Sequence, residues 1–121
     1  MRSNKKWWRI WIRSKLLKIE VGEKEYTLGY PTRKDARNAE INGLDITNAG
    51  KVLILTETLF FTGLLAKQPQ ITREEAVELL EQYIQEGGEA EEITQFLINE
   101  YVAFTKSPDG AKKKKAKIVE M

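Results

Sequence analysis

The chain has 121 residues, a length that fits one domain with a modest core of its own. It contains no cysteine and no histidine, which excludes disulfides and thiolate chemistry and removes the commonest general base and zinc ligand. The formal net charge of +2 hides an uneven distribution, because residues 1–18 carry seven bases and no acid whereas residues 71–105 carry nine acids and one base.

All three tryptophans lie in the basic stretch KKWWRIWIR, residues 5–13. On a helix, Trp7, Trp8 and Trp11 would share one broad side with basic groups opposite, a pattern that suits a membrane interface or a single-stranded nucleic acid. Two other interpretations stay open. In one, the tryptophans pack on the elements that follow; in the other, residues 1–15 are not part of the domain.

A β-hairpin is predicted over about residues 16–30. Apolar and polar residues alternate in the runs LKIEV and YTLGY, on the two sides of a connection that contains glycine. A two-stranded hairpin is only marginally stable in water, so we expect it to lie on other elements of the chain.

Four helices are predicted after the hairpin, over about residues 32–43, 48–67, 72–86 and 89–106. Thr32 is the expected N-cap of the first helix, and Thr72 opens a capping box in the third. Gly43 and Gly87 are the expected ends of these same two helices, since glycine readily adopts the left-handed conformation that ends a helix.

The second predicted helix is the most apolar element of the chain. Its apolar residues extend around most of its circumference: Val52, Leu53, Ile54, Leu55, Leu59, Phe60, Phe61, Leu64 and Leu65. Such a helix is either central or pairs with a partner. Thr47 or Asn48 is its expected N-cap, and Gly63 within it is expected to permit a close backbone approach. The stretch is too short to span a bilayer and contains Glu57.

These elements predict one α+β, mostly helical domain over residues 16–107, between a basic extension of residues 1–15 and a flexible lysine-rich tail of residues 108–121. The dense carboxylates from Glu74 to Glu92 fall mostly on the polar faces of two helices, which favours a solvated surface over an acid–base pair or a metal site. No glycine-rich phosphate loop is present. We therefore expect no enzymatic activity, no metal and no cofactor.

Three stretches follow one another in an informative order: IEVGEKEYTLGYPTRKDARNAEINGLDI, LFFTGLLAKQPQITREEAVELLEQ and ITQFLINEYVAF. They begin with a hairpin and a polar helix that ends at Gly43-Leu44-Asp45, and continue with an apolar helix and a capped acidic helix. In this order, and from Lys18 to Pro108, the chain resembles the tail assembly chaperones, small phage and prophage proteins of long-tailed phages of Gram-positive hosts.

The resemblance implies a cytoplasmic assembly factor that is absent from the finished virion. Members of this family hold the long, helical tape-measure protein in solution and recruit tail-tube protein. Such a function needs an apolar groove or an exposed helix face, and we predict partner contacts at Leu59, Phe60 and Leu64. The other interpretation of these three residues is that they are core. Exposed apolar surface is also compatible with a homo-oligomer.

Two further features suggest hypotheses about the gene. Many relatives in this family are made in two lengths by a ribosomal slip, and Lys112–Lys115 would mark the frameshift site if its codons form a run of adenines. Relatives usually begin just before the hairpin, and Trp8-Arg9 is compatible with the ribosome-binding sequence GGAGG. Residues 1–15 would then be a translated leader.

The alternative function comes from the N-terminal stretch and belongs to a different class. In it, the chain is a small cationic protein that associates with a membrane or a nucleic acid through its Trp- and Arg-rich N-terminus. Association with anionic vesicles or DNA would then be salt-sensitive and would be lost on deletion of residues 1–15.

Overall fold

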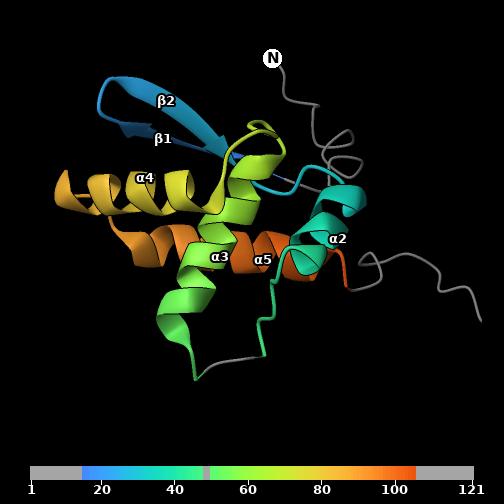
Figure 1. Cartoon of the computed structure of the whole chain (residues 1–121). Coiled ribbons are helices and arrows are strands. Elements are labelled where there is room, and N and C mark those ends of the chain that lie inside the picture. Colours follow the sequence, from blue (N-terminus) through green and yellow to red (C-terminus); the bar gives the residue numbers. More distant parts are fainter. Residues whose placement is uncertain (1–14, 48–49, 106–121) are drawn as a thin grey trace, which may run out of the picture.

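The computed structural model describes residues 15–47 and 50–105 (Figure 1). In chain order, its elements are β1 Leu17–Val21, β2 Lys24–Leu28, α2 Arg33–Ile41, α3 Val52–Leu65, α4 Arg73–Gln85 and α5 Ala90–Ala103. A hairpin followed by four helices confirms the predicted α+β, mostly helical fold. Residues 1–14 and the tail from residue 106 lie outside the described residues, so the hypotheses about both ends stay predictions.

The hairpin pairs β1 and β2 antiparallel along their full length. The two-residue turn Gly22–Glu23 joins them, and Gly22 has a positive φ of 65°, a conformation that glycine adopts without strain. Ile19, Val21 and Leu28 are buried, because one face of the hairpin lies against α3 and α4 (Figure 1). The expectation that the hairpin packs on other elements is therefore confirmed.

The ends of α2 and α4 follow their sequence signals. Thr32 and Thr72 both form capping boxes, in which the hydroxyl accepts from the N–H three residues later and the side chain there accepts from the N-cap N–H. Gly43 and Gly87 follow the two C-caps with positive φ values of 106° and 99°. The backbone bonds around them form Schellman motifs, which satisfy carbonyls that a helix end leaves free.

Helix α3 begins later than predicted. It begins at Val52, and Lys51 at its N-cap position makes no side-chain cap bond. Thr47 does not cap the helix, because its N–H and its hydroxyl donate to Asp45 Oδ1 at 3.0 and 2.6 Å in a turn of their own. Asn48 lies outside the described residues. The other helix boundaries agree with the prediction to within three residues.

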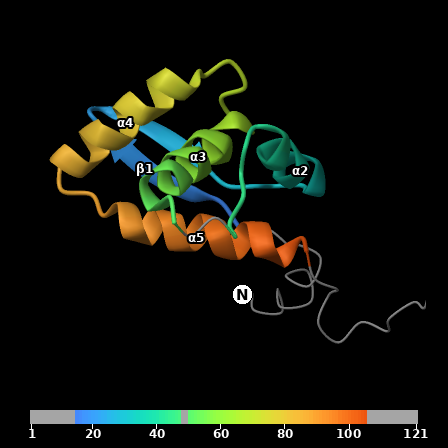
Figure 2. The same cartoon turned by 60° about the horizontal axis from the view of Figure 1, so that its bottom comes forward.

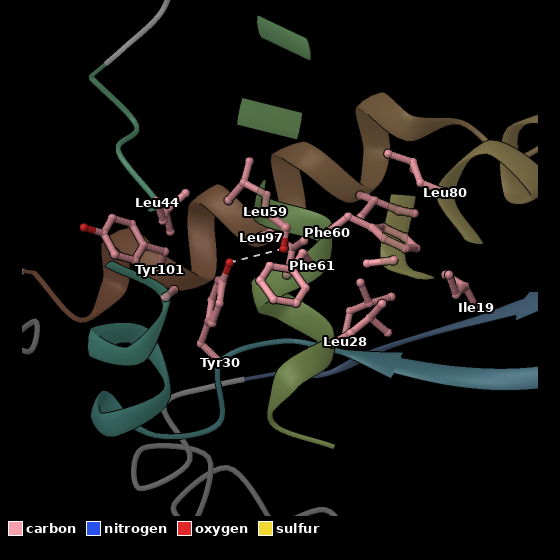
Figure 3. Packing of buried hydrophobic residues seen from close by; sticks show 14 of the residues in the cluster. Ile19, Leu28, Tyr30, Leu44, Leu59, Phe60, Phe61, Leu80, Leu97 and Tyr101 are labelled. Atoms are coloured by element: carbon pink, nitrogen blue, oxygen red, sulfur yellow. Dashed lines mark hydrogen bonds between the residues drawn. The ribbon is translucent and has the colours of Figure 1, made fainter. Parts of the chain in front are cut away.

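Helix α3 lies at the centre of the fold and contacts β2, α2, α4 and α5 (Figure 2). The largest fully buried side chains are Tyr30, Phe60, Leu28, Leu59, Leu64 and Leu97 (Figure 3). A single cluster of buried residues includes members from the hairpin and all four helices. Of the two alternatives for the apolar helix, a central position and pairing with a partner, the structure shows the central position.

Two glycines bring β2, α3 and α5 close together. The N–H of Gly29, which follows β2, donates to the carbonyl of Gly63 in α3 at 3.0 Å. A Cβ atom at Gly63 would lie 2.9 Å from Cδ2 of Leu97 in α5, and one at Gly29 would lie 3.0 Å from the carbonyl oxygen of Lys15. The close approach expected at Gly63 is therefore confirmed.

Candidate partner-binding surface

The three residues predicted to contact a partner lie in the core. Leu59 and Leu64 are 0% exposed and Phe60 is 1% exposed. Figure 3 shows Leu59 and Phe60 among the buried side chains around α3. In this structure their role is packing, which was the other interpretation of the sequence, because their surfaces are covered by neighbouring elements. A partner surface must come from other residues.

The amino-terminal end of α3 is apolar and exposed. Val52, Leu53 and Ile54 are 63%, 80% and 53% exposed, and we call these three residues the α3 apolar end. In Figure 1 this end of the helix extends below α4 and α5. Single exposed apolar side chains are ordinary on a protein surface, but three in succession leave a whole helical turn apolar toward solvent, which is typical of an interaction site.

The residues of α3 become more buried from its amino-terminal end toward Leu64, so burial varies along the helix axis as well as around it. Leu55 is half-buried and packs against the core, and every residue from Thr58 to Leu64 is buried. Helical spacing groups Val52 with Leu55 and Leu59, but periodicity does not show how far along the axis a helix is covered. The sequence did contain a signal for this exposure in the run VLIL, residues 52–55. Four consecutive residues of a helix cannot all lie on one side of it, so some of these side chains must face away from the core.

A second surface lies beside α4, where a groove of about 570 Å³ separates β2 and α4 near the α3–α4 connection. Tyr26, Ile71 and Leu79 contribute apolar lining, and Lys67 and Glu78 contribute charged groups. A mixture of apolar and polar groups is usual in protein interfaces. Sequence reasoning missed this groove, because its lining comes from three segments that only the tertiary fold brings together.

A buried set of hydroxyl groups crosses the core beside α3. The Tyr30 hydroxyl lies 2.8 Å from Thr62 Oγ1, and the Thr62 hydroxyl donates to the Thr58 carbonyl at 2.8 Å. Burial raises the pKa of Tyr30 well above its usual range. Because the Thr62 hydroxyl donates to Thr58, the Tyr30 hydroxyl is the donor to Thr62. Each of these buried groups has a partner, as a structural network requires.

The acidic residues of α4 and its surroundings lie in solvent. All carboxylates from Glu74 to Glu92 belong to exposed residues, which confirms the predicted solvated face. Glu57, inside α3, is half-buried. Across residues 15–47 and 50–105, no group of three or more acidic, His or Cys side chains could hold a metal ion. None of the described helices is long and apolar enough to cross a membrane.

Comparisons of the chain with protein-family models, with curated proteins and with solved structures found no match. The α3 apolar end and the groove beside α4 offer different chemistry to a partner. The first is a turn of three exposed apolar side chains, and the second is lined by apolar and charged side chains together.

Proposed function

We propose that this protein is a phage tail assembly chaperone, which binds the helical tape-measure protein and aids tail-tube assembly in the host cytoplasm. The resemblance of Lys18–Pro108 to that family supports the proposal. The order of elements also supports it, since a hairpin, a polar helix, an apolar helix and a capped acidic helix follow one another as the resemblance implies.

The observation that carries the proposal is the exposed α3 apolar end. An amphipathic helix of a tape-measure protein has an apolar face that must be kept from water before the tail is built. The exposed side chains of Val52, Leu53 and Ile54 can pack against that face. Fully burying one such side chain stabilises a complex by roughly 1.5–3 kcal/mol. The surface is preorganised, because the carboxyl-terminal half of the same helix is anchored in the core.

Co-expression of the full chain with the tape-measure protein tests this function. We expect the wild type to keep the tape-measure protein soluble and Leu53→Glu to lose most of that effect, because the new carboxylate would have to be desolvated on binding. Leu53 is 80% exposed, so the substitution should cost little folding stability.

The matched control is Ile84→Glu, which makes the same kind of change at a 44% exposed apolar residue on α4. This variant should solubilise the tape-measure protein as well as the wild type does. An insoluble tape-measure protein beside the wild-type chain would contradict the proposed function. Equal solubilisation by Leu53→Glu and the wild type would show that the tape-measure protein does not contact the α3 apolar end.

The gene neighbourhood gives an independent test. A tail-tube gene upstream and a very long helical reading frame downstream would support the proposal, and a neighbourhood without tail genes would contradict it. The codons of Lys112–Lys115 test the frameshift hypothesis in the same region. Mostly AAG codons, with no overlapping downstream frame, would reject it.

A further inference from the structure

Strand β2 has one edge that pairs with no other strand of the described residues. The sheet that they form has two strands, so each strand is paired along one edge only (Figure 1). Val21 and Lys24 flank the two-residue turn and form its closing hydrogen-bonded pair. Since backbone groups alternate between the two edges of a strand, those of Tyr26 point toward β1, and those of Glu25 and Thr27 point away from it. We call the N–H and C=O groups of Glu25 and Thr27 the β2 edge.

The β2 edge is not covered by another described part of the chain. Among residues 15–47 and 50–105, no hydrogen bond joins the backbone of Glu25 or Thr27 to a residue outside the hairpin. The next backbone link to another element comes after the strand, where the N–H of Gly29 donates to the carbonyl of Gly63. Glu25 is exposed and Thr27 is half-buried. The unpaired backbone groups of such an edge are a template for a further strand.

The groove beside α4 lies on the β2 side of the hairpin. Its lining includes Tyr26 of β2 and no residue of β1. The side chain of Tyr26 is on the helix-facing side of the hairpin, because its cross-strand partner Ile19 is buried there. A strand added at the β2 edge would direct every second side chain to this same side, toward Ile71 and Leu79 of the groove. The groove volume of about 570 Å³ is within the range of ligand pockets and leaves room for such side chains.

Polar groups of the groove are available to a partner. The hydroxyl of Tyr26, the ammonium of Lys67 and the carboxylate of Glu78 make no hydrogen bond or ion pair with residues 15–47 or 50–105. The α4 side of the groove contains Glu75 and Glu78 and no basic residue. The only base of α4, Arg73, is directed to α3 instead. This side of the groove therefore complements a basic side chain.

We propose that the β2 edge binds an extended segment of a partner protein, which adds to the hairpin as a third, antiparallel strand. On the side that faces the helices, the segment carries an apolar residue that contacts Ile71 and Leu79 and a basic residue that pairs with Glu78. In this mode of binding, main-chain hydrogen bonds give affinity and the side-chain contacts give specificity. A second copy of this chain fits less well, because it would bring its own acidic α4 to the contact. This inference does not rest on the proposed function, since it concerns another surface and an extended partner.

A synthetic peptide tests the proposal on the full chain. The probe has seven residues and capped ends, and threonine alternates in it with Lys, Leu and Lys, so the apolar and basic side chains share one face. In the free chain, the amides of Glu25 and Thr27 should exchange with solvent faster than that of Tyr26, which is bonded to β1. Adding the probe to isotopically labelled chain should shift the NMR signals of both amides and slow their exchange. No such change at about 1 mM probe, the concentration of a weak complex, would overturn the proposal.

Two N-methylated forms of the probe are matched in composition and charge. Methylation of the two threonines beside the leucine removes the donors that face the β2 edge, and should weaken binding at least about fivefold. Methylation of the leucine and one lysine removes donors from the outer edge of the peptide only, and should leave binding within about twofold of the unmethylated probe. Equal affinities of the two forms would overturn the proposal, because the peptide would then bind without forming a strand.

Proline substitutions at the two open edges of the hairpin are the matched protein variants. Glu25→Pro removes a donor of the β2 edge and should weaken binding of the probe about threefold or more. Glu20→Pro makes the same change at the exposed cross-strand partner on β1, whose N–H also points away from the hairpin, and should bind the probe as the wild type does. Equal binding by all three chains would contradict the proposal. Far-UV circular dichroism checks their folding, and the methylated peptides decide the outcome on the unaltered chain if a variant fails to fold.

A charge change in the groove tests the predicted chemistry of the partner. Glu78→Gln should weaken binding of the lysine-containing probe, whereas Glu81→Gln, at an exposed residue of α4 outside the groove lining, should not. Equal binding by these two variants would overturn the assignment of a basic partner. Slow exchange of the Glu25 and Thr27 amides that appears with rising protein concentration, without the probe, would overturn the proposal and assign the β2 edge to a second copy.

Discussion

Glu86, the C-cap of α4, links two parts of the fold that are 64 residues apart in sequence. The N–H of Gly22 in the hairpin turn donates to both carboxylate oxygens of Glu86, at 3.0 and 3.1 Å. Gln82 Nε2 donates to the same group at 2.9 Å. The bond from Gly22, followed by that from Gln82, lowers the pKa of the Glu86 carboxyl.

This lowered pKa makes folding stability depend on pH. The stabilisation is complete above the unfolded-state pKa of about 4.3 and is lost as pH falls through the lower pKa of the folded state. We predict that Glu86→Gln lowers the free energy of unfolding at pH 7, and that its difference from the wild type shrinks below about pH 4. Urea unfolding at the two pH values measures this.

The control for this prediction is Glu81→Gln on the same helix, whose side chain makes no hydrogen bond with residues 15–47 or 50–105. It should change stability little at either pH, because an exposed and unpaired carboxylate contributes little. A difference between Glu86→Gln and the wild type that stays constant across the pH range would show that the carboxylate charge is not what holds the hairpin turn.

A second long-range link joins α2 to α5. The hydroxyl of Tyr101 donates to the carboxylate of Glu40, and this bond together with burial raises the pKa of Tyr101 to about 12. The rings of Tyr101 and Tyr30 meet edge to face with centroids 6.3 Å apart. The short polar helix α2, whose buried residues are only Ala36 and Ala39, thus gains a polar attachment to the core.

At the scale of elements, a local sequence signal and a tertiary contact both stabilise the start of α4. Thr72 caps the helix through the capping box that its sequence predicts. The next residue, Arg73, donates to the hydroxyl of Thr58 and lies over the ring of Phe61, with its guanidinium carbon 5.9 Å from the ring centroid. The start of α4 is therefore held both by its own backbone geometry and by α3.

We predict that Thr72→Ala lowers the free energy of unfolding by about 1 kcal/mol, because the N–H of Glu75 loses its acceptor. Chemical denaturation measures the change. The matched control is Thr105→Ala, an exposed threonine after α5 whose hydroxyl donates to the nearby carbonyl of Val102. It should stay within about 0.5 kcal/mol of the wild type. Equal losses in both variants would contradict the role of the cap.

At the scale of the whole molecule, α3 divides into a surface end and a core end. We predict that Leu59→Ala costs about 2–5 kcal/mol of unfolding free energy, because it opens a cavity in the core. Leu53→Ala should change stability by no more than about 0.5 kcal/mol, since Leu53 is 80% exposed.

Urea unfolding of both variants checks the prediction, and the pair makes the same chemical change within one helix. Similar costs at the two positions would contradict the division of α3 into a buried and an exposed end. A costly Leu53→Ala together with a concentration-dependent midpoint would indicate that a second copy covers the α3 apolar end, because such an association stabilises the folded chain by mass action.

The sequence by itself was enough to predict the hairpin, the four helices and the four ends of α2 and α4, which carry cap signals. These depend on groups a few residues apart, such as Thr72 with Glu75 or Gly43 with the last turn of α2. The period-two alternation also agrees with the burial of Ile19 and Leu28, because the apolar residues of a strand pair gather on one of its two faces.

Only the tertiary structure decided which part of α3 is surface. Helix α3 is apolar nearly all round, so its sequence has no polar side to mark solvent, and burial depends on how far the neighbouring elements reach along its axis. Leu59, Phe60 and Leu64 therefore became core, and Val52, Leu53 and Ile54 became surface. Local cap chemistry sets the ends of α2 and α4, whereas the burial of each turn of α3 depends on how the whole molecule packs.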